Sequence, residues 1–292
     1  YLKQNALAHP YKKAVLCPAG RDGDGRRAYT HLTFSQLDRE ADRYAQGLAG
    51  AGISRGCRTV LMVKPGMDFF ILTFALFKSG AVPVVVDPGM GLKRMVECLR
   101  ESEPDAFVGI PLAHVLRLVY AKHFFSVKTW VTVGKKWFWG GLSTRDFQAL
   151  PDKAFTMANT KREDTAAILF TTGSTGPAKG VVYTHGTFDA QIQAIHRHFE
   201  IAPDETDLPT FPLFALFDPA LGITAVIPDM DFTKPAQVNP ENILGAITDH
   251  GITNMFASPA LLNTVGEYGK EYGVKLPTLK RVVSAGAPVF PS

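Results

Sequence analysis

The sequence predicts an α/β fold in which βαβ units surround parallel sheets. Short apolar runs, typical of buried strands, alternate with stretches whose apolar residues recur at helical spacing. With 292 residues, 46% of them hydrophobic, the chain can bury a large core without disulfide support. Its 26 glycines and 20 prolines separate these stretches and form no low-complexity run.

The first half of the chain predicts alternating helices and strands. Thr33 and Gln36 have the spacing of a capping box, and apolar residues at 37, 41, 44 and 48 form one helical face. Glycines at 50 and 52 end this helix. The elements expected next are a strand at 59–63, a helix from 69 to Gly80, a strand at 82–86 closed by Asp87 and Pro88, a helix with an apolar face over 92–99, and a strand at 106–109.

The same alternation resumes at residue 165. Ser258 is a suitable N-cap and Pro259 suits the first helical position, so a helix is expected to start there. Gly251 ends the helix that precedes it. The other expected elements are strands at 165–170, 181–183, 252–256 and 279–284 and helices over 188–199 and 243–247. The second half therefore repeats the βαβ pattern.

Charge and cysteine content narrow the function. The net charge is +4 and the basic residues are scattered, which argues against a nucleic-acid partner. Cys17, Cys57 and Cys98 stand far apart, so neither a disulfide framework nor a zinc site is expected. The longest apolar run, 69–77, is too short to cross a bilayer. These observations favour a cytoplasmic protein without a transmembrane segment.

Residues 130–139 hold all three tryptophans together with Lys135 and Lys136. One interpretation is an amphipathic surface for a membrane or a partner, because tryptophan favours half-wet sites. The other is an aromatic plug in the core or at a domain seam. We favour the plug, since a chain this rich in apolar residues must pack most of its rings.

A polar loop between two apolar strands carries the chemistry. Residues 170–180 read Phe-Thr-Thr-Gly-Ser-Thr-Gly-Pro-Ala-Lys-Gly. Glycines allow close backbone approach to a ligand, and successive N–H groups in such a turn bind anions. Four hydroxyls and the ammonium of Lys179 complete a set suited to a polyphosphate, and one hydroxyl is a candidate ligand of Mg²⁺.

Better-known phosphate and nucleophile loops do not fit this segment. A Walker A loop fails because Ala178 precedes Lys179 and Gly180 follows it. The dinucleotide-binding pattern of glycines fails as well. A nucleophile elbow requires glycine two residues before the serine, where Thr172 precedes Ser174. A flexible hairpin without a ligand is the remaining alternative.

The loop resembles the phosphate-binding motif of the adenylate-forming superfamily, which comprises acyl-CoA synthetases, peptide-synthetase adenylation domains and luciferases. Pro177-Ala178 replaces the usual x-Pro, a mild departure. Further similarity lies at 78–84, at Asp87-Pro88, at 181–185 and at 284–288. The resemblance implies that residues 1–292 form most of a large N-terminal AMP-binding domain. A small C-terminal lid domain, with the expected glutamate and lysine, would follow beyond Ser292.

This resemblance implies a reaction and residue roles. A carboxylate attacks the α-phosphorus of ATP, which yields an acyl-adenylate and pyrophosphate. Thr171 is the implied ligand of Mg²⁺ and phosphate, and Lys179 holds the departing pyrophosphate; these two are the candidate catalytic residues. Further ATP contacts are implied for the loop residues Thr172, Gly173, Ser174, Thr175 and Gly176 and for the adenine turn Ala285, Gly286, Ala287 and Pro288. His185 is a further candidate to approach the phosphates.

Residues 210–222 carry a narrower resemblance. Acyl-CoA synthetases usually read Pro-Leu-Phe-His here, and Ala215 stands in place of the histidine. Together with residues 227–231, the segment is similar to the OleC-type β-lactone synthetases of bacterial olefin biosynthesis. That similarity implies a long-chain 2-alkyl-3-hydroxy fatty acid as substrate, whose 3-hydroxyl closes the ring after adenylation without a thiol acceptor. It also implies association with other enzymes of that pathway.

The same segment supplies the candidate substrate contacts Phe211, Phe214, Ala215, Phe217 and Asp218. Its aromatic residues either wall an alkyl tunnel or form ordinary core. Asp218 either accepts a hydrogen bond from the substrate hydroxyl or caps a turn before Pro219, and we favour the cap. Two other functions stay open: a long-chain acyl-CoA ligase, which would need CoA, and a nucleotide-binding fragment without catalysis.

Overall fold

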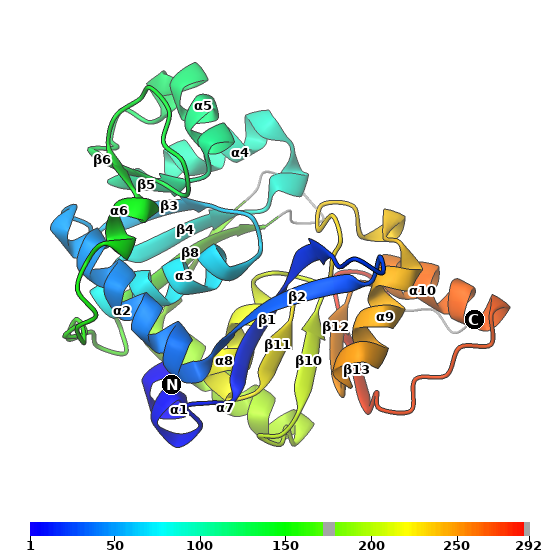
Figure 1. Ribbon diagram of the computed structural model, residues 1–292. Coiled ribbons are helices and arrows are strands. Elements are labelled where there is room, and N and C mark those ends of the chain that lie inside the picture. The colour runs from blue at the N-terminus through cyan, green and yellow to red at the C-terminus, as the bar shows by residue number, and fades with distance from the viewer. Residues whose placement is uncertain (172–178, 289–292) are drawn as a thin grey trace. The chain divides into compact units, whose positions relative to one another are not determined.

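The computed structural model describes residues 1–171 and 179–288. The chain divides into two compact units, and each holds its own sheet (Figure 1). Unit 1 comprises Tyr1–Leu37, Pro65–Met67 and Ala194–Ser292, and unit 2 comprises Asp38–Lys64 and Asp68–Gln193.

Unit 2 holds a sheet in the order β7-β6-β5-β3-β4-β8-β9. Its strands are β3 (Arg58–Met62), β4 (Val82–Val86), β5 (Ala106–Gly109), β6 (Thr129–Thr132), β7 (Leu142–Ser143), β8 (Thr165–Thr171) and β9 (Lys179–Thr184). All neighbouring pairs are parallel except β8 and β9, which form an antiparallel hairpin.

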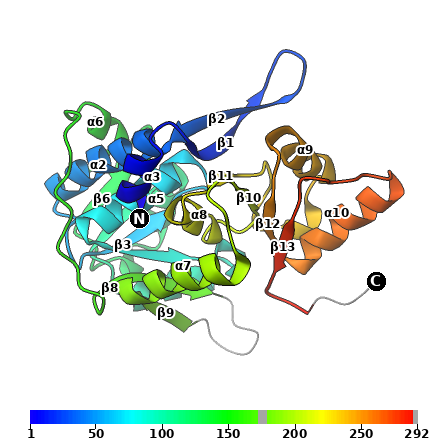
Figure 2. The same ribbon diagram turned by 90° about the horizontal axis from the view of Figure 1, so that it is seen from below.

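Helices cover both faces of this sheet. Figure 1 shows α2 (Phe34–Gly50) and α3 (Met67–Ser79) on one face and α4 (Leu92–Glu101) and α5 (Pro111–Val119) on the other. On the second face, Val96 and Leu99 of α4 pack against Val60 and Val84 in a buried cluster. The short helix α6 (Thr144–Gln148) follows β7, and the first residues of α7 (His185–Phe199) lie across β8 and β9 (Figure 2).

A buried ion cluster joins α2 to α3 in unit 2. The Nζ atom of Lys78 lies 2.6 Å from Asp38 Oδ1 and 2.5 Å from Asp42 Oδ1. It also donates to the backbone carbonyl of Asp38. All three side chains are buried, and the ammonium offsets part of the cost of burying the two carboxylates.

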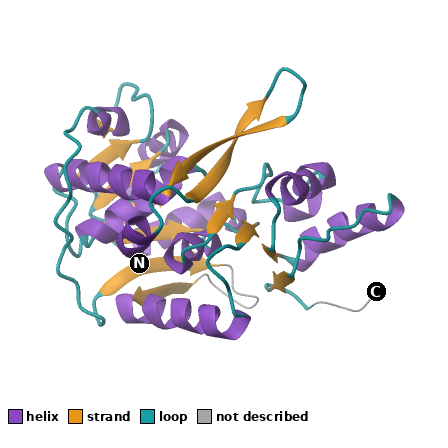
Figure 3. Cartoon of the chain, turned by 60° about the horizontal axis from the view of Figure 1, so that its bottom comes forward, coloured by secondary structure: helices purple, strands orange, loops and turns teal. Residues whose placement is uncertain are grey.

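Unit 1 holds a sheet in the order β13-β12-β10-β11-β1-β2. Its strands are β1 (Lys13–Arg21), β2 (Arg27–Thr33), β10 (Thr206–Pro209), β11 (Thr224–Val226), β12 (Asn254–Ala257) and β13 (Arg281–Ser284). The pair β1–β2 is antiparallel and forms the long ribbon visible in Figure 3, whereas the other pairs are parallel.

The helices of unit 1 are α1 (Leu2–Ala8), α8 (Phe217–Leu221), α9 (Pro240–His250) and α10 (Pro259–Glu271). Ile243 of α9 and Leu261 of α10 pack with Leu208 and Val226 of the sheet in one buried cluster. Short 3₁₀ turns complete the chain: η1 (Pro88–Met90), η2 (Ala121–His123), η3 (Phe214–Leu216) and η4 (Pro235–Gln237).

A polar cluster ties together the amino ends of three strands in unit 1. Arg281 donates to Glu205 Oε1 at 2.9 Å and to Oε2 at 2.5 Å, and it also contacts the side chain of Asn254. The Arg281 guanidinium holds the pKa of Glu205 down at about 2. This cluster lies at the edge opposite to the carboxyl ends of the parallel strands.

Most local expectations are confirmed. The Thr33–Gln36 capping box forms in both directions, the strands at 82–86 and 106–109 have the expected bounds, and Ser258 caps α10. The apolar run 69–77 is the buried helix α3, and no helix of the described residues is long and apolar enough to span a membrane. Antiparallel pairing of β9 and the whole β1–β2 ribbon were not predicted by the βαβ alternation.

Candidate active site

The predicted phosphate loop closes the β8–β9 hairpin. Thr171 at the end of β8 pairs with Lys179 at the start of β9. The loop residues Thr172, Gly173, Ser174, Thr175 and Gly176 lie outside the described residues. Because β8 runs parallel to β4, Thr171 stands at the carboxyl edge of the parallel strands. Ligands of α/β sheets bind at this edge.

The backbone beside the loop is closely packed. A Cβ atom at position 180 would lie 2.9 Å from the ring of Phe170, so the glycine there is required by the neighbouring strand. The N–H group of Asp87, just after β4, donates to the carbonyl of Phe170 at 3.2 Å. The loop therefore starts from two strands and a turn that are held in register.

The expected adenine turn follows β13 in unit 1. Gly286 has a φ of +98°, a conformation that a residue with a side chain rarely adopts. Ser284 precedes the turn, and its hydroxyl is buried without a hydrogen-bond partner among the described residues. Ala285, Ala287 and Pro288 are exposed around this glycine. The turn thus presents backbone and small side chains, as close approach of a flat ring would require.

The aromatic segment follows β10 in the same unit. It forms η3 and α8, which lie between β10 and β11 along the chain. Phe214 is 40% exposed and stacks on Phe256 of β12 with ring centroids 4.0 Å apart. Its ring also lies 5.6 Å from that of Phe211 and 6.4 Å from that of Phe217. Ala215 is fully buried beside these rings.

Asp218 is buried in the first turn of α8 and faces another carboxyl group. It is hydrogen-bonded to Asp207 of β10, which is also buried. Burial raises the pKa of Asp207 to about 7. Burial and the charge of Asp207 raise the pKa of Asp218 well above its usual range, so Asp218 carries the shared proton. Its Oδ2 atom has no hydrogen-bond partner among the described residues.

The topology brings two of the three predicted segments to one edge. In the order β13-β12-β10, the carboxyl ends of β13 and β10 flank that of β12. The adenine turn and the aromatic segment are therefore neighbours within unit 1. Thr171 and Lys179 belong to unit 2.

Sequence reasoning missed Asp207. The sequence Thr206-Asp207-Leu208-Pro209 could have indicated it, because an acidic residue next to apolar ones in a short strand is unusual. Only the fold shows that this acid meets Asp218. His185 was suggested for the phosphates, but Thr184 before it pairs with Thr165, so His185 lies at the amino edge of the sheet. Its ring instead contacts Phe77.

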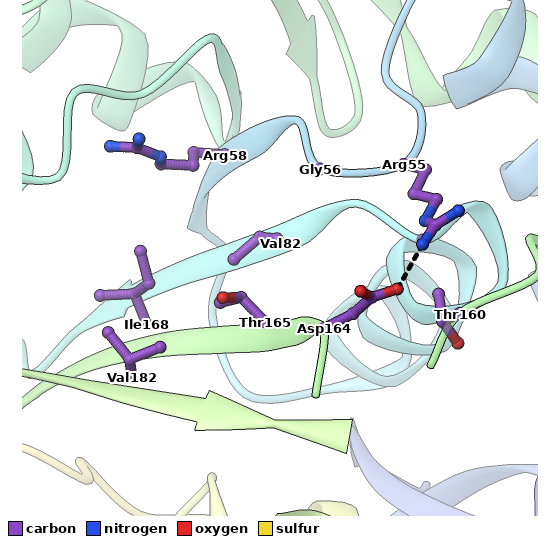
Figure 4. A pocket seen from close by; sticks show the side chains of 10 residues that line it. Arg55, Gly56, Arg58, Val82, Thr160, Asp164, Thr165, Ile168 and Val182 are labelled. Carbon is purple, nitrogen blue, oxygen red and sulfur yellow. Dashed lines mark hydrogen bonds and ion pairs between the residues drawn. The ribbon is translucent and has the colours of Figure 1, made fainter. Parts of the chain in front are cut away.

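A cavity of about 440 Å³ opens at that same amino edge of unit 2 (Figure 4). An ion pair between Arg55 and Asp164 spans 2.6 Å at one end, and Ile168 and Val182 line the other. Hydrogen bonds from Lys161 and Arg55 lower the pKa of Asp164. Because its charges are already paired and it lies away from Thr171, this cavity is not the predicted site.

Among residues 1–171 and 179–288, no group of three or more His, Cys, Asp or Glu side chains could hold a metal ion. The candidate Mg²⁺ ligand remains the hydroxyl of Thr171 together with phosphate oxygens.

Two similar curated proteins carry the same name. An olefin β-lactone synthetase of Stenotrophomonas maltophilia (strain K279a) is 50% identical over 99% of this chain and 52% of its own length. A protein of the same name from Xanthomonas campestris pv. campestris is 47% identical over the same shares. The chain thus spans about half the length of the curated relatives it matches.

Solved structures agree with the fold. The anthranilate CoA ligase AuaEII, in complex with anthranoyl-AMP, matches 99% of this chain and 54% of its own with a TM-score of 0.85 at 19% identity. Mycobacterium smegmatis MbtA matches 99% of this chain and 51% of its own with a TM-score of 0.81 at 25% identity. The family model for the AMP-binding enzyme matches residues 2–292. The chain therefore belongs to this family of adenylate-forming enzymes.

Proposed function

We propose that the protein containing this chain converts a long-chain 2-alkyl-3-hydroxy fatty acid to a β-lactone at the expense of ATP. The names of relatives that share half of its residues over the whole chain support this. The observation that carries the choice of product is Ala215, which is fully buried where acyl-CoA synthetases usually have histidine. The proposal extends to the whole protein, of which this chain supplies one part.

In the first step, an oxygen of the substrate carboxylate attacks the α-phosphorus of ATP. The bond to the β-phosphate oxygen breaks and pyrophosphate leaves. We assign the hydroxyl of Thr171 and the ammonium of Lys179 to phosphate oxygens, because both residues border the loop at the carboxyl edge. Residues 172–176 and the turn 285–288 are proposed to hold the phosphates and the adenine. Bound Mg²⁺ would neutralise part of the phosphate charge.

In the second step, the substrate's own 3-hydroxyl attacks the acyl carbonyl. The new C–O bond closes the four-membered ring, the bond to the AMP phosphate breaks, and AMP leaves with the electron pair. We propose that the hydroxyl proton goes to the Asp207–Asp218 pair: Asp218 takes it on Oδ2 while its own proton passes to the carboxylate of Asp207. Asp218 is the proposed contact for this hydroxyl, since it lies three residues beyond Ala215 and one of its oxygens has no described partner.

The aromatic segment is proposed to hold the alkyl chains. Phe214 offers an exposed face at the carboxyl edge, and Phe211 and Phe217 lie against its ring. Burial of alkyl carbons against such rings contributes about 0.8 kcal/mol per CH₂ group. Long chains are therefore favoured over short acids.

Product analysis of the full-length enzyme tests the proposal. With ATP and Mg²⁺, the hydroxy acid should give β-lactone, AMP and pyrophosphate whether or not CoA is present. The substrate without its 3-hydroxyl should still support pyrophosphate exchange into ATP but should release little AMP. A thioester from a plain fatty acid and CoA, without lactone from the hydroxy acid, would show an acyl-CoA ligase instead. If no acid supports pyrophosphate exchange into ATP, the protein binds nucleotide without catalysing adenylation.

A further inference from the structure

The edge of the unit 2 sheet where β6 and β7 lie carries an exposed surface that the candidate site does not use. It is formed by α5 and by residues 133–141, which connect β6 to β7. In Figure 1, α5 stands over the end of the sheet that holds β5 and β6. This surface exposes large apolar side chains together with lysines.

On α5 a histidine points inward, whereas two of the apolar side chains are largely exposed. His114 is fully buried, and its Nε2 donates to the carbonyl of Val131 at 3.1 Å. Burial lowers the pKa of His114 to about 4, so the ring is neutral. Leu112 and Val119 are 71% and 72% exposed. A helix face that meets only water normally carries polar residues.

The connection between β6 and β7 adds aromatic rings next to this helix. Trp139 is buried and stacks on His114, with ring centroids 5.2 Å apart. Trp137 and Phe138 contact Trp139 at 5.3 and 5.2 Å and are 52% and 81% exposed. The plug predicted for residues 130–139 is confirmed at Trp139, whereas Trp137 and Phe138 contact it and remain exposed.

The stretch of chain that contains these rings carries charge of one sign. Residues 106–145 contain no acidic residue, although the whole chain has 27. The six basic residues of that stretch are Arg117, Lys122, Lys128, Lys135, Lys136 and Arg145. Lys135 and Lys136 are exposed directly before Trp137. Exposed lysines, tryptophan and phenylalanine therefore share one loop.

We propose that Leu112, Val119, Lys135, Lys136, Trp137 and Phe138, the cationic aromatic face, bind the anionic surface of a lipid bilayer. Tryptophan and phenylalanine are stable at the boundary between headgroups and acyl chains, and lysines attract anionic lipid phosphates. A second copy of this chain fits poorly, because it would bring the same positive charges into contact. Partner proteins fit less well, since lysine is depleted from the core of protein interfaces.

Vesicle binding by the full-length protein tests this face without ATP or substrate, so its outcome is separate from that of the proposed function. Sedimentation is compared between vesicles of phosphatidylcholine alone and vesicles that also contain phosphatidylglycerol. We expect binding to the anionic vesicles that weakens as salt rises. Trp137→Ser/Phe138→Ser and Lys135→Ser/Lys136→Ser should each lower the partition coefficient about ten-fold or more. Trp137→Tyr should retain most of the binding.

Matched variants outside the face serve as controls. Tyr11→Ser removes another highly exposed ring, and Lys270→Ser/Lys275→Ser removes two other exposed lysines. Both should bind vesicles like the wild type. The proposal is overturned if the protein does not bind anionic vesicles, or if the face variants bind as well as these controls. It is also overturned if the Trp137→Ser/Phe138→Ser variant instead changes the oligomeric state, which sedimentation velocity would show.

Discussion

Asp218 of α8 and Asp207 of β10 share one proton in the interior of unit 1, where both carboxyl groups are buried. Two adjacent carboxylates cannot both ionise at low cost in such a place, so at least one is held as the acid. Asp207 precedes the aromatic segment, and Asp218 follows Ala215 by three residues. The shared proton makes the stability of unit 1 depend on pH. It also places a group that can exchange a proton beside the proposed acyl site.

Replacing Asp218 by Asn should remove most of that pH dependence. The pKa of Asp207 is about 7 in the fold and about 3.9 in an unfolded chain, so the native state binds more protons between these values. Stability should therefore fall as pH rises from about 4 through about 7. Asp218→Asn should be more stable than the wild type by ~1–3 kcal/mol at about pH 8, and nearly equal at about pH 5.

Urea denaturation of the full chain at the two pH values measures this difference. Asp24→Asn, in the exposed β1–β2 turn, is the control and should leave the pH profile unchanged. If the free energies of unfolding of Asp218→Asn and the wild type differ by the same amount at both pH values, the two carboxyl groups do not share a proton.

The same variant separates the two half-reactions. Asp218→Asn should slow lactone formation by ~10²-fold, the range of general-base catalysis, because an amide cannot pass the hydroxyl proton on to Asp207. Pyrophosphate exchange should persist, because the first step does not use that hydroxyl. Equal losses in exchange and in lactone formation would point to a role in folding alone.

Lys179→Ala should weaken pyrophosphate exchange by ~2–3 kcal/mol in transition-state stabilisation, because a fixed positive charge on the phosphates is lost. Isotope exchange into ATP with saturating hydroxy acid is the measurement. Lys153→Ala, at an exposed position, should behave like the wild type. An unchanged rate in Lys179→Ala would remove the β8–β9 loop from the proposed chemistry.

Phe214→Ala should raise KM for the long-chain acid by roughly 10-fold, since burial of such a ring against alkyl carbons contributes ~1.5–3 kcal/mol. A short-chain hydroxy acid should be affected much less. Steady-state kinetics with the two acids give the ratio. Phe125→Ala, which removes an equally bulky and more exposed ring, should leave both KM values as they are.

Lys78→Met should destabilise unit 2 by ~3–5 kcal/mol, because Asp38 and Asp42 would remain buried without their shared cation. Thermal unfolding measures the loss. Adding Asp42→Asn to Lys78→Met should restore part of it by removing one uncompensated charge. Lys275→Met, at an exposed site, should change the melting temperature little.

The sequence alone determined the features that depend on near neighbours in the chain. Helix starts at Thr33 and Ser258, the helix end at Gly251, and the strands at 82–86 and 106–109 follow from capping and apolar spacing. The phosphate loop and the substitution at Ala215 were also visible there, because motif chemistry is carried by consecutive residues.

Only the tertiary structure decided strand direction, since an apolar run pairs equally well in either orientation and β9 turns back on β8. The partners of buried charges were decided there as well: Asp207 meets Asp218, and Lys78 meets Asp42, across separations that no local pattern encodes. The tertiary structure also decided which tryptophans are buried. Trp139 stacks on the buried His114 and is itself buried, whereas Trp137 is 52% exposed.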